Sequence, residues 1–210
     1  TLRFLAVSNH TYSLLHRGLA HSGAWLKLAD VPAESWKNGG GVTRTLAVHG
    51  DEWRVSIATI SQDGAYSRFP GLRRLSMILS GAGVVLRGSG GTVELLPWRP
   101  LQYDGALDWQ ARLADGPCQA LNVMARDGAY ELSACTVDGR AGIPAGVHAL
   151  VLANGSQLSI GHAAEGRLAN LHQDEYAVMA PGPDARTVVA DAVGAQPILI
   201  LIAPVPAGRS

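Results

Sequence analysis

The chain has 210 residues, of which 47% are hydrophobic, and its 17 basic side chains balance 17 acidic ones. This composition suits one large or two small folded domains and excludes a disordered chain, which needs low hydrophobicity and high net charge. The zero formal net charge argues against a nucleic-acid partner, and the longest apolar run, residues 198–203, is too short to span a membrane.

The N-terminal segment differs from the rest of the chain. Residues 1–25 hold three of the seven histidines among leucines and serines, and we expect a loosely attached arm. The apolar stretch at residues 4–7 makes a poor signal peptide. The two cysteines, Cys118 and Cys135, are too few for a disulfide framework, so a reduced cytoplasmic setting is predicted.

Short apolar or alternating runs recur along the remaining chain, separated by Gly, Pro, Asn and Asp, as in all-β sandwiches and barrels. No stretch after residue 30 keeps a helical apolar period over three turns. The expected strands are 43–48, 53–60, 75–79, 84–87, 92–96, 131–137, 147–153, 157–160, 175–180, 186–190 and 198–203. Strand density is similar on both sides of Asp127-Gly128, which predicts two barrels, residues 26–127 and 128–210; a single large sandwich is the alternative.

Catalytic and metal-binding motifs are largely missing from the sequence. There is no H-E-x-x-H, G-x-S-x-G or phosphate-loop motif. The glycine run at residues 39–41 precedes an expected strand, whereas a phosphate cradle needs a helix N-terminus. The H-x-H pair typical of metal-dependent cupin barrels is also missing. We therefore expect no metal and no cofactor.

Two expected strands each carry an Arg-x-Ser pair. In residues 53–58, Arg54 and Ser56 share one face, and Arg74 and Ser76 repeat the arrangement on a later strand. In a half-exposed sheet this face would meet solvent. In a closed barrel it would line a polar cavity able to hold a carboxylate by bidentate hydrogen bonds.

The same region resembles the HutD/Ves protein family. The resemblance rests on four ordered strings: W-K-N-G-G-G-V-T-R at residues 36–44, W-R-V-S-I-A at 53–58, D-G-A-Y-S-R-F-P-G at 63–71 and R-R at 73–74. It is clear over residues 28–128 and continues only in strand pattern. The sequence departs from the family where Thr45 replaces a usual Glu and where Ala120-Leu121 replaces a usual Asp-Phe. Losing two acids leaves the arginines less compensated.

The resemblance implies an all-β bicupin, with two double-stranded β-helix (jelly-roll) barrels in one chain and without the usual metal ligands. It also implies a non-catalytic, small-molecule-binding regulator of bacterial histidine utilisation, with a small anionic metabolite such as N-formylglutamate or urocanate as its partner. The expected main anchor of the ligand is Arg54, with Arg74 as a second charge. Ser56 and Thr43 are the expected hydroxyl donors. Asn38 and the backbone of Gly40 and Gly41 are expected to form a wall of the site.

Two other functions fit the same residues. A cupin-type isomerase or hydrolase acting on a small organic acid would use Glu52, Asp63 or a histidine as acid or base. A protein-interaction scaffold would instead expose an apolar patch of several hundred Å². Exposed barrel edges are also compatible with a homodimer.

Overall fold

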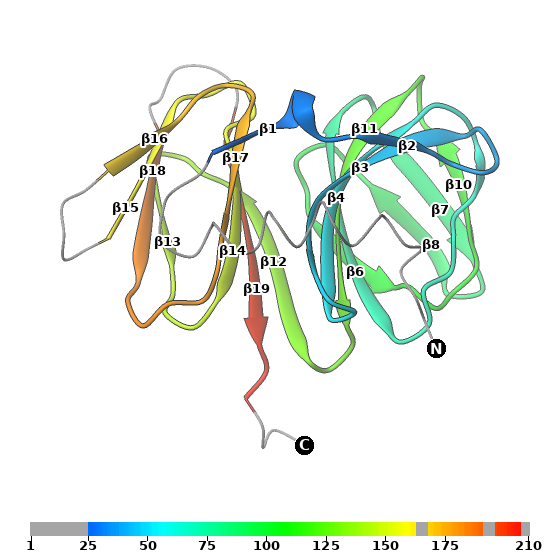
Figure 1. The fold of residues 1–210 in the computed structure, drawn as a ribbon. Helices are drawn as coiled ribbons and strands as arrows, with labels where there is room; N and C mark the ends of the chain where they lie inside the picture. The colour runs from blue at the N-terminus through cyan, green and yellow to red at the C-terminus, as the bar shows by residue number, and fades with distance from the viewer. Residues whose placement is uncertain (1–24, 163–167, 191–195, 207–210) are drawn as a thin grey trace. The chain divides into compact units, whose positions relative to one another are not determined.

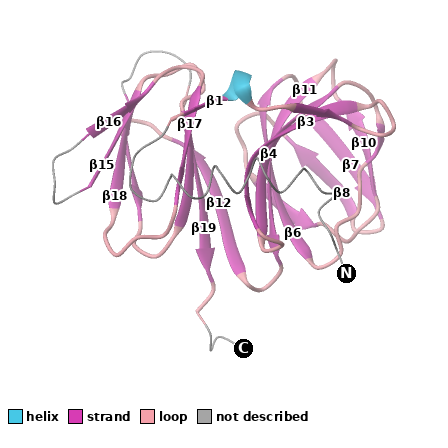
Figure 2. Ribbon diagram, in the orientation of Figure 1, coloured by secondary structure: helices cyan, strands magenta, loops and turns pink. Residues whose placement is uncertain are grey.

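The computed structural model describes residues 25–162, 168–190 and 196–206. These residues form two compact units, one made of residues 31–129 and the other containing residues 25–30 together with the described residues from 130 onward. In the described residues both units consist of β-strands joined by loops, and the one helix there is a short 3-10 turn, η1 (Leu28–Asp30) (Figure 2). The predicted all-β fold is confirmed.

The unit of residues 31–129, called here the N-terminal barrel, contains two antiparallel sheets (Figure 1). The first sheet has the order β2-β3-β4-β11-β6-β9 and the second the order β5-β10-β7-β8. The strands are β2 (Ala33–Ser35), β3 (Gly41–His49), β4 (Trp53–Ile60), β5 (Gly64–Ala65), β6 (Leu72–Ser80), β7 (Val84–Gly88), β8 (Gly91–Leu95), β9 (Leu101–Asp104), β10 (Trp109–Leu113) and β11 (Cys118–Arg126).

The core of the N-terminal barrel lies between its two sheets. Ile60, Ile78 and Ala120 come from the six-stranded sheet, and Leu86 and Trp109 come from the four-stranded sheet. Because side chains alternate across a strand, these contacts identify the inner face of β4, β6 and β11 as the one carrying even-numbered residues.

The second unit is also built from two antiparallel sheets, with the orders β1-β17-β14-β19-β12 and β13-β18-β15-β16. Its strands are β1 (Leu26–Lys27), β12 (Tyr130–Thr136), β13 (Arg140–Ile143), β14 (His148–Leu152), β15 (Leu158–His162), β16 (Leu168–Leu171), β17 (Glu175–Met179), β18 (Arg186–Ala190) and β19 (Ile198–Pro204). Its core cluster is wholly apolar, including Ile143, Val151, Val188 and Leu199.

The division of the chain differs from the expected one at both ends of the first barrel. Residues 26–30 do not belong to it, because Leu26 and Lys27 pair with Tyr176 and Glu175 in the sheet of the second unit. The second unit resumes at Tyr130 rather than at residue 128. The predicted arm, residues 1–25, lies outside the described residues except for Trp25, which packs against the core of the second unit.

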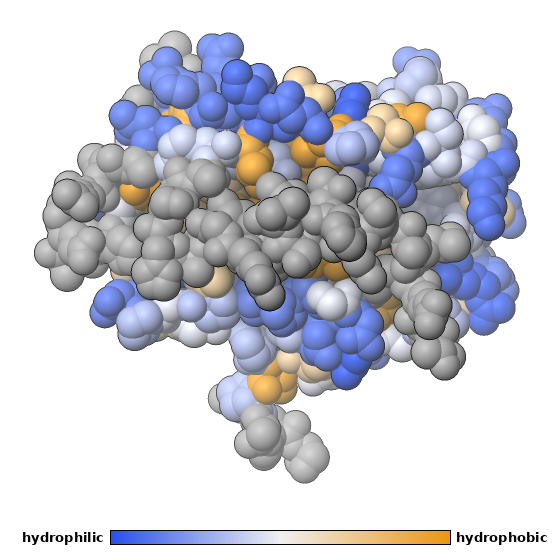
Figure 3. Space-filling model, viewed as in Figure 1, coloured by the Kyte–Doolittle hydropathy of each residue, from blue (hydrophilic) through white to orange (hydrophobic). Residues whose placement is uncertain are grey.

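Polar side chains cover much of the described surface on the side shown in Figure 3. Among the described residues, the exposed large hydrophobic side chains are Leu96 and Trp98, which follow β8, and Leu101, the first residue of β9. No helix in the described part of the chain is both long and apolar enough to cross a membrane.

Candidate functional site

Buried polar groups in the described chain are concentrated on one face of one sheet. Five of the six buried polar or charged residues lie on β3, β4, β6 and β11 of the N-terminal barrel, and the sixth is Ser156 of the second unit; the five are Thr45, Ser56, Arg74, Ser76 and Asn122. All five carry their side chains on the inner face, by alternation with the core residues of the same strands.

The central strand β11 brings the two predicted Arg-x-Ser strands together. Met124 pairs with Arg54 on one side and with Arg74 on the other. Directly opposed residues point to the same face of a sheet, so both arginines lie on the inner face, two strand spacings or about 10 Å apart along the backbone. The structure therefore places both Arg-x-Ser pairs on one enclosed face rather than toward solvent.

Three aromatic rings surround Arg74. The residue is only 5% exposed, and its guanidinium carbon lies 5.2, 5.6 and 5.1 Å from the ring centroids of Tyr66, Phe69 and Tyr103. One amino group, Nη2, donates to Asn122 Oδ1 at 3.3 Å. Within the described part of the chain Arg74 forms no ion pair, and its buried Nε–H has no acceptor.

This arrangement leaves the charge of Arg74 only partly compensated. Each cation–π contact contributes on the order of 0.5–2 kcal/mol, whereas burying an unpaired charge costs several kcal/mol. Guanidinium has five N–H donors, and the one hydrogen bond to Asn122 uses a single donor. An external carboxylate would supply both the missing charge and the missing acceptors.

A chain of hydrogen bonds holds the acceptor of Arg74 in place. The Ser76 hydroxyl donates to Asn122 Oδ1 at 2.8 Å and lies 2.9 Å from the Tyr103 hydroxyl. Because a hydroxyl has one proton to donate, Tyr103 must donate to Ser76. The Asn122 amide nitrogen donates to the Ala120 carbonyl at 3.3 Å. The acceptor of Arg74 is therefore an amide oxygen, which carries no charge.

Tyr66 adds no negative charge beside Arg74. Burial, with a further contribution from Tyr103, raises the pKa of the Tyr66 phenol far above its ordinary value, and the nearby Arg74 lowers that pKa only in part. The phenol therefore stays protonated at neutral pH. It contributes the quadrupole of its ring rather than a counter-ion.

The segment that carries Tyr66 and Phe69 is tied down by the loop between β9 and β10. The Tyr66 N–H donates to the Trp109 carbonyl at 2.8 Å, and the Phe69 N–H donates to the Gly105 carbonyl at 2.6 Å. These backbone bonds fix the two rings over Arg74.

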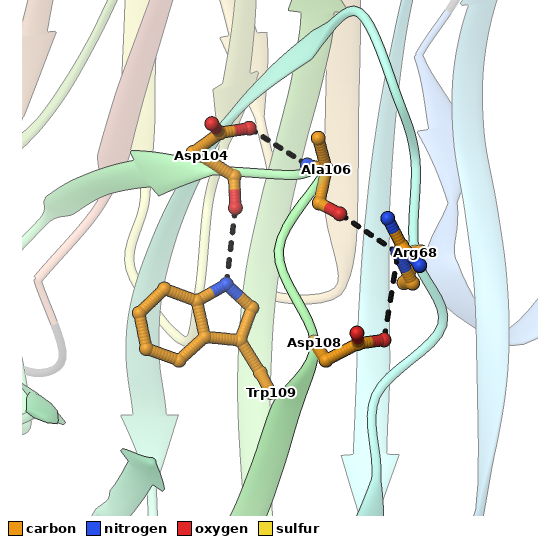
Figure 4. A network of polar contacts seen from close by, with 5 residues as sticks. All are labelled: Arg68, Asp104, Ala106, Asp108 and Trp109. Atoms are coloured by element: carbon orange, nitrogen blue, oxygen red, sulfur yellow. Dashed lines mark hydrogen bonds and ion pairs between the residues drawn. The ribbon is translucent and has the colours of Figure 1, made fainter. Parts of the chain in front are cut away.

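Arg68 reinforces this connection from the surface (Figure 4). Its Nε–H donates to the Ala106 carbonyl at 2.8 Å and lies 3.4 Å from an Asp108 carboxylate oxygen. Within the same loop, Asp104 Oδ1 accepts from the Ala106 N–H at 2.7 Å, and the Trp109 indole donates to the Asp104 carbonyl at 3.0 Å. The exposed Arg68–Asp108 pair itself contributes little to stability.

Three of the predicted ligand contacts, Asn38, Gly40 and Gly41, lie at the turn between β2 and β3. Gly40 donates its N–H to Asn38 Oδ1 at 3.0 Å, which closes a turn. Gly41 pairs with Ile60, six residues along β4 from Arg54. A Cβ on Gly41 would overlap the carbonyl oxygen of Thr59. Gly41 is explained by the close approach of β4, and the roles of these three residues as ligand contacts stay predictions.

Thr43 occupies an intermediate position. It lies on the inner face of β3, opposite Ala58, and its hydroxyl accepts a hydrogen bond from the Trp36 indole at 2.8 Å. Trp36 in turn meets Tyr66 edge to face, with ring centroids 6.2 Å apart. Thr43 is therefore linked through Trp36 to Tyr66, one of the rings around Arg74. Its role as a ligand contact stays a prediction.

The sequence analysis did not include several residues of this site among the ligand contacts. Tyr66 and Phe69 stand in the family-like string at residues 63–71, but nothing local directs them toward Arg74. Asn122 and Tyr103 join through strand pairing with β6. The signal that could have identified Asn122 is its even-numbered position in a strand whose alternate residues, Cys118 and Ala120, are core.

Two of the acid and base candidates for an enzyme, Glu52 and Asp63, lie in the loops before and after β4 rather than on the inner face of the sheet. Glu52 pairs with Arg126 at 3.1 Å, and the exposed Asp63 accepts the Leu113 N–H at 2.8 Å. Among residues 25–162, 168–190 and 196–206, no three His, Cys, Asp or Glu side chains gather in a way that could hold a metal ion.

Comparison with known proteins matches most of the chain, across both units, to one family. The sequence model of a family described as HutD matches residues 28–195. The "Uncharacterized 21.2 kDa protein in hutC 3'region" of Pseudomonas putida is 32% identical over 106 residues, which cover 47% of this chain and 56% of that protein. "Protein Ves" of Citrobacter koseri is 33% identical over 109 residues, which cover 49% of this chain and 57% of that protein. The chain thus spans little more than half the length of these curated relatives.

Solved structures confirm the fold. HutD from Pseudomonas fluorescens SBW25, solved in a formate condition, superposes with a TM-score of 0.71 at 24% identity and covers 88% of this chain and 100% of its own. A cupin 2 conserved barrel domain protein from Leptotrichia buccalis superposes with a TM-score of 0.53 at 10% identity, covering 89% of this chain and all of its own. The predicted cupin architecture is therefore confirmed.

Proposed function

The chain belongs to the HutD family, and on this premise we propose that it is a cytoplasmic, non-catalytic regulatory protein of bacterial histidine utilisation. In this proposal it binds a small carboxylate intermediate, such as N-formylglutamate or urocanate, on the inner face of the N-terminal barrel. Arg54 was expected from the sequence as the main anchor and Arg74 as the second charge; in this proposal the two roles are exchanged, because Arg74 is the buried arginine of the two.

The observation that carries the proposal is the environment of Arg74. The guanidinium is almost fully buried and forms no ion pair in the described part of the chain, and its Nε–H points at no acceptor. Arg presents a planar fork that matches a carboxylate bidentately. The name of the Pseudomonas putida relative refers to the hutC region, which supports a ligand from histidine breakdown.

The N-terminal barrel is favoured over the second unit because the two cores differ. Among the described residues, the N-terminal barrel has five buried polar or charged side chains, including Arg74, whereas the second unit has one, Ser156. A carboxylate needs polar partners when it leaves water. Of the two units, the N-terminal barrel therefore offers more such partners and the one buried charge.

A thermal-shift panel tests the proposal. N-formylglutamate, urocanate, formate and, as the uncharged match of formate, formamide are added to the full chain. A ligand at about 100 times its dissociation constant stabilises the folded state by ~2.7 kcal/mol, which raises the melting temperature by about 5–11 °C for a chain of this size. We expect a shift with the acids and none with formamide.

Two results would contradict the proposal. One is the absence of any shift with the acids at millimolar concentration. The other is chemical conversion of the ligand: after incubation with the protein, urocanate and N-formylglutamate should be recovered unchanged by chromatography, and their loss would favour the enzyme instead.

A further inference from the structure

Thr45 is a second unpartnered group on the face that carries Arg74. It lies on β3 opposite Ser56, and Ser56 in turn pairs with Asn122, which pairs with Ser76. These four polar residues therefore form one row across four adjacent strands. Thr45 is 4% exposed, and its hydroxyl has no hydrogen-bond partner among the described residues.

An unsatisfied buried hydroxyl is unfavourable for folding. Removing it by an isosteric apolar replacement is neutral or stabilising, because no bond is lost. Valine has nearly the same shape as threonine and suits a strand better than most residues. Local stability therefore does not explain the Thr45 hydroxyl, in contrast to Thr43, whose hydroxyl accepts from the Trp36 indole.

The distance between the two unpartnered groups suits a small molecule. The Arg74 guanidinium lies between Tyr103 on β9, whose ring centroid is 5.1 Å away, and Asn122 on β11, to which it donates at 3.3 Å. From β11 to β3 are two strand spacings, about 10 Å, since neighbouring strands lie 4.7–4.9 Å apart. Ser56 on β4 lies between them. A ligand held at both ends would thus place its two polar groups on the order of 5–10 Å apart.

We propose that Thr45 is a specificity-determining residue, and that the ligand of this barrel is a bifunctional acid with a carboxylate at one end and a second hydrogen-bonding group at the other. This inference rests on the proposed carboxylate site and adds the far end of the ligand to it. A hydroxyl both donates and accepts, so the second group is a ring nitrogen, an amide or a further carboxylate oxygen. Acids with an apolar far end lack this contact.

Thr45→Val tests the inference when two acids of the same shape are compared by calorimetry. Urocanate carries a carboxylate and an imidazole ring, and cinnamate carries the same carboxylate and a phenyl ring. Loss of one hydrogen bond weakens binding by about 3- to 10-fold. We expect this loss for urocanate and less than a 2-fold change for cinnamate, so that the variant no longer distinguishes the two acids.

Thr92→Val is the control, because it makes the same substitution at an exposed position of β8, in the other sheet of the same barrel. It should leave the binding of both acids unchanged. The unliganded Thr45→Val protein should melt at the same temperature as the parent or a few degrees higher, since no protein hydrogen bond is lost.

Three outcomes would overturn the inference. In the first, Thr45→Val binds urocanate as tightly as the parent; in the second, it loses affinity for both acids to the same extent. In the third, the unliganded variant melts several degrees lower with the preference for urocanate intact, which would assign the hydroxyl a structural role. Failure of the carboxylate site itself is a separate result, seen when neither acid binds the parent protein.

Discussion

Asn122→Asp tests the charge of Arg74 by supplying a counter-ion from within the barrel. Asn122 Oδ1 already accepts from Ser76 at 2.8 Å and from Arg74 Nη2 at 3.3 Å, and aspartate places a charged oxygen there with no change in size. At an effective dielectric constant of about 20, unit charges this far apart attract by ~5 kcal/mol.

Two costs oppose that attraction. Burial of the new carboxylate costs several kcal/mol, and loss of the amide donor to the Ala120 carbonyl costs about 1 kcal/mol. We expect a net gain of about 1 kcal/mol in the free energy of unfolding, or roughly 2–4 °C in melting temperature. The internal carboxylate should also displace an external one, so urocanate should bind at least ~10-fold more weakly.

Asn122→Leu is the control, because it removes the acceptor of Ser76 and Arg74 without adding charge. It should be less stable than the parent protein. The assay is thermal and urea unfolding at pH 7 without ligand, followed by calorimetry with urocanate. If Asn122→Asp is less stable than Asn122→Leu, then the surrounding rings already compensate Arg74, and the reasoning is refuted.

Two further substitutions test the structural contacts of Gly41 and Thr43, two of the residues predicted to touch a ligand. Gly41→Ala should lower the free energy of unfolding by about 1–3 kcal/mol, because its Cβ overlaps the Thr59 carbonyl. Gly142→Ala, with open space around it, should change stability by less than about 1 kcal/mol; equal urea midpoints for the two variants would contradict this. Trp36→Phe should cost about 1 kcal/mol, because Thr43 loses its donor, and an unchanged urea midpoint would show that this bond contributes nothing.

The strands β4 and β6 could be predicted from sequence because each carries a polar pair in alternation with apolar residues. The central strand β11 could not. Six consecutive residues are buried both in β11, residues 120–125, and in β6, residues 74–79. The difference is composition, because β11 carries Ala and Asn, which strands disfavour, where β6 carries Leu and Ile. Missing β11 also hid the reason why the two Arg-x-Ser pairs meet.

The candidate site shows the same limit. The arginines at positions 54 and 74 stand out by local pattern, but Asn122 and Tyr103 reach Arg74 through long-range pairing with β6. The backbone of Gly41 was expected to approach a ligand closely as part of a wall, and in the structure its missing side chain admits the Thr59 carbonyl. Close approach of backbone can be inferred from a glycine, but the approaching partner cannot.

Calorimetry on Arg74→Gln and Arg73→Gln tests the central claim most directly. Both substitutions remove one positive charge at adjacent positions of β6. Arg73 is exposed and pairs with Asp127 at 3.0 Å, whereas Arg74 is buried on the inner face. We predict that Arg74→Gln abolishes binding of urocanate and N-formylglutamate while Arg73→Gln binds both like the parent protein; equal binding by the two variants would contradict the assignment of Arg74 as the carboxylate anchor.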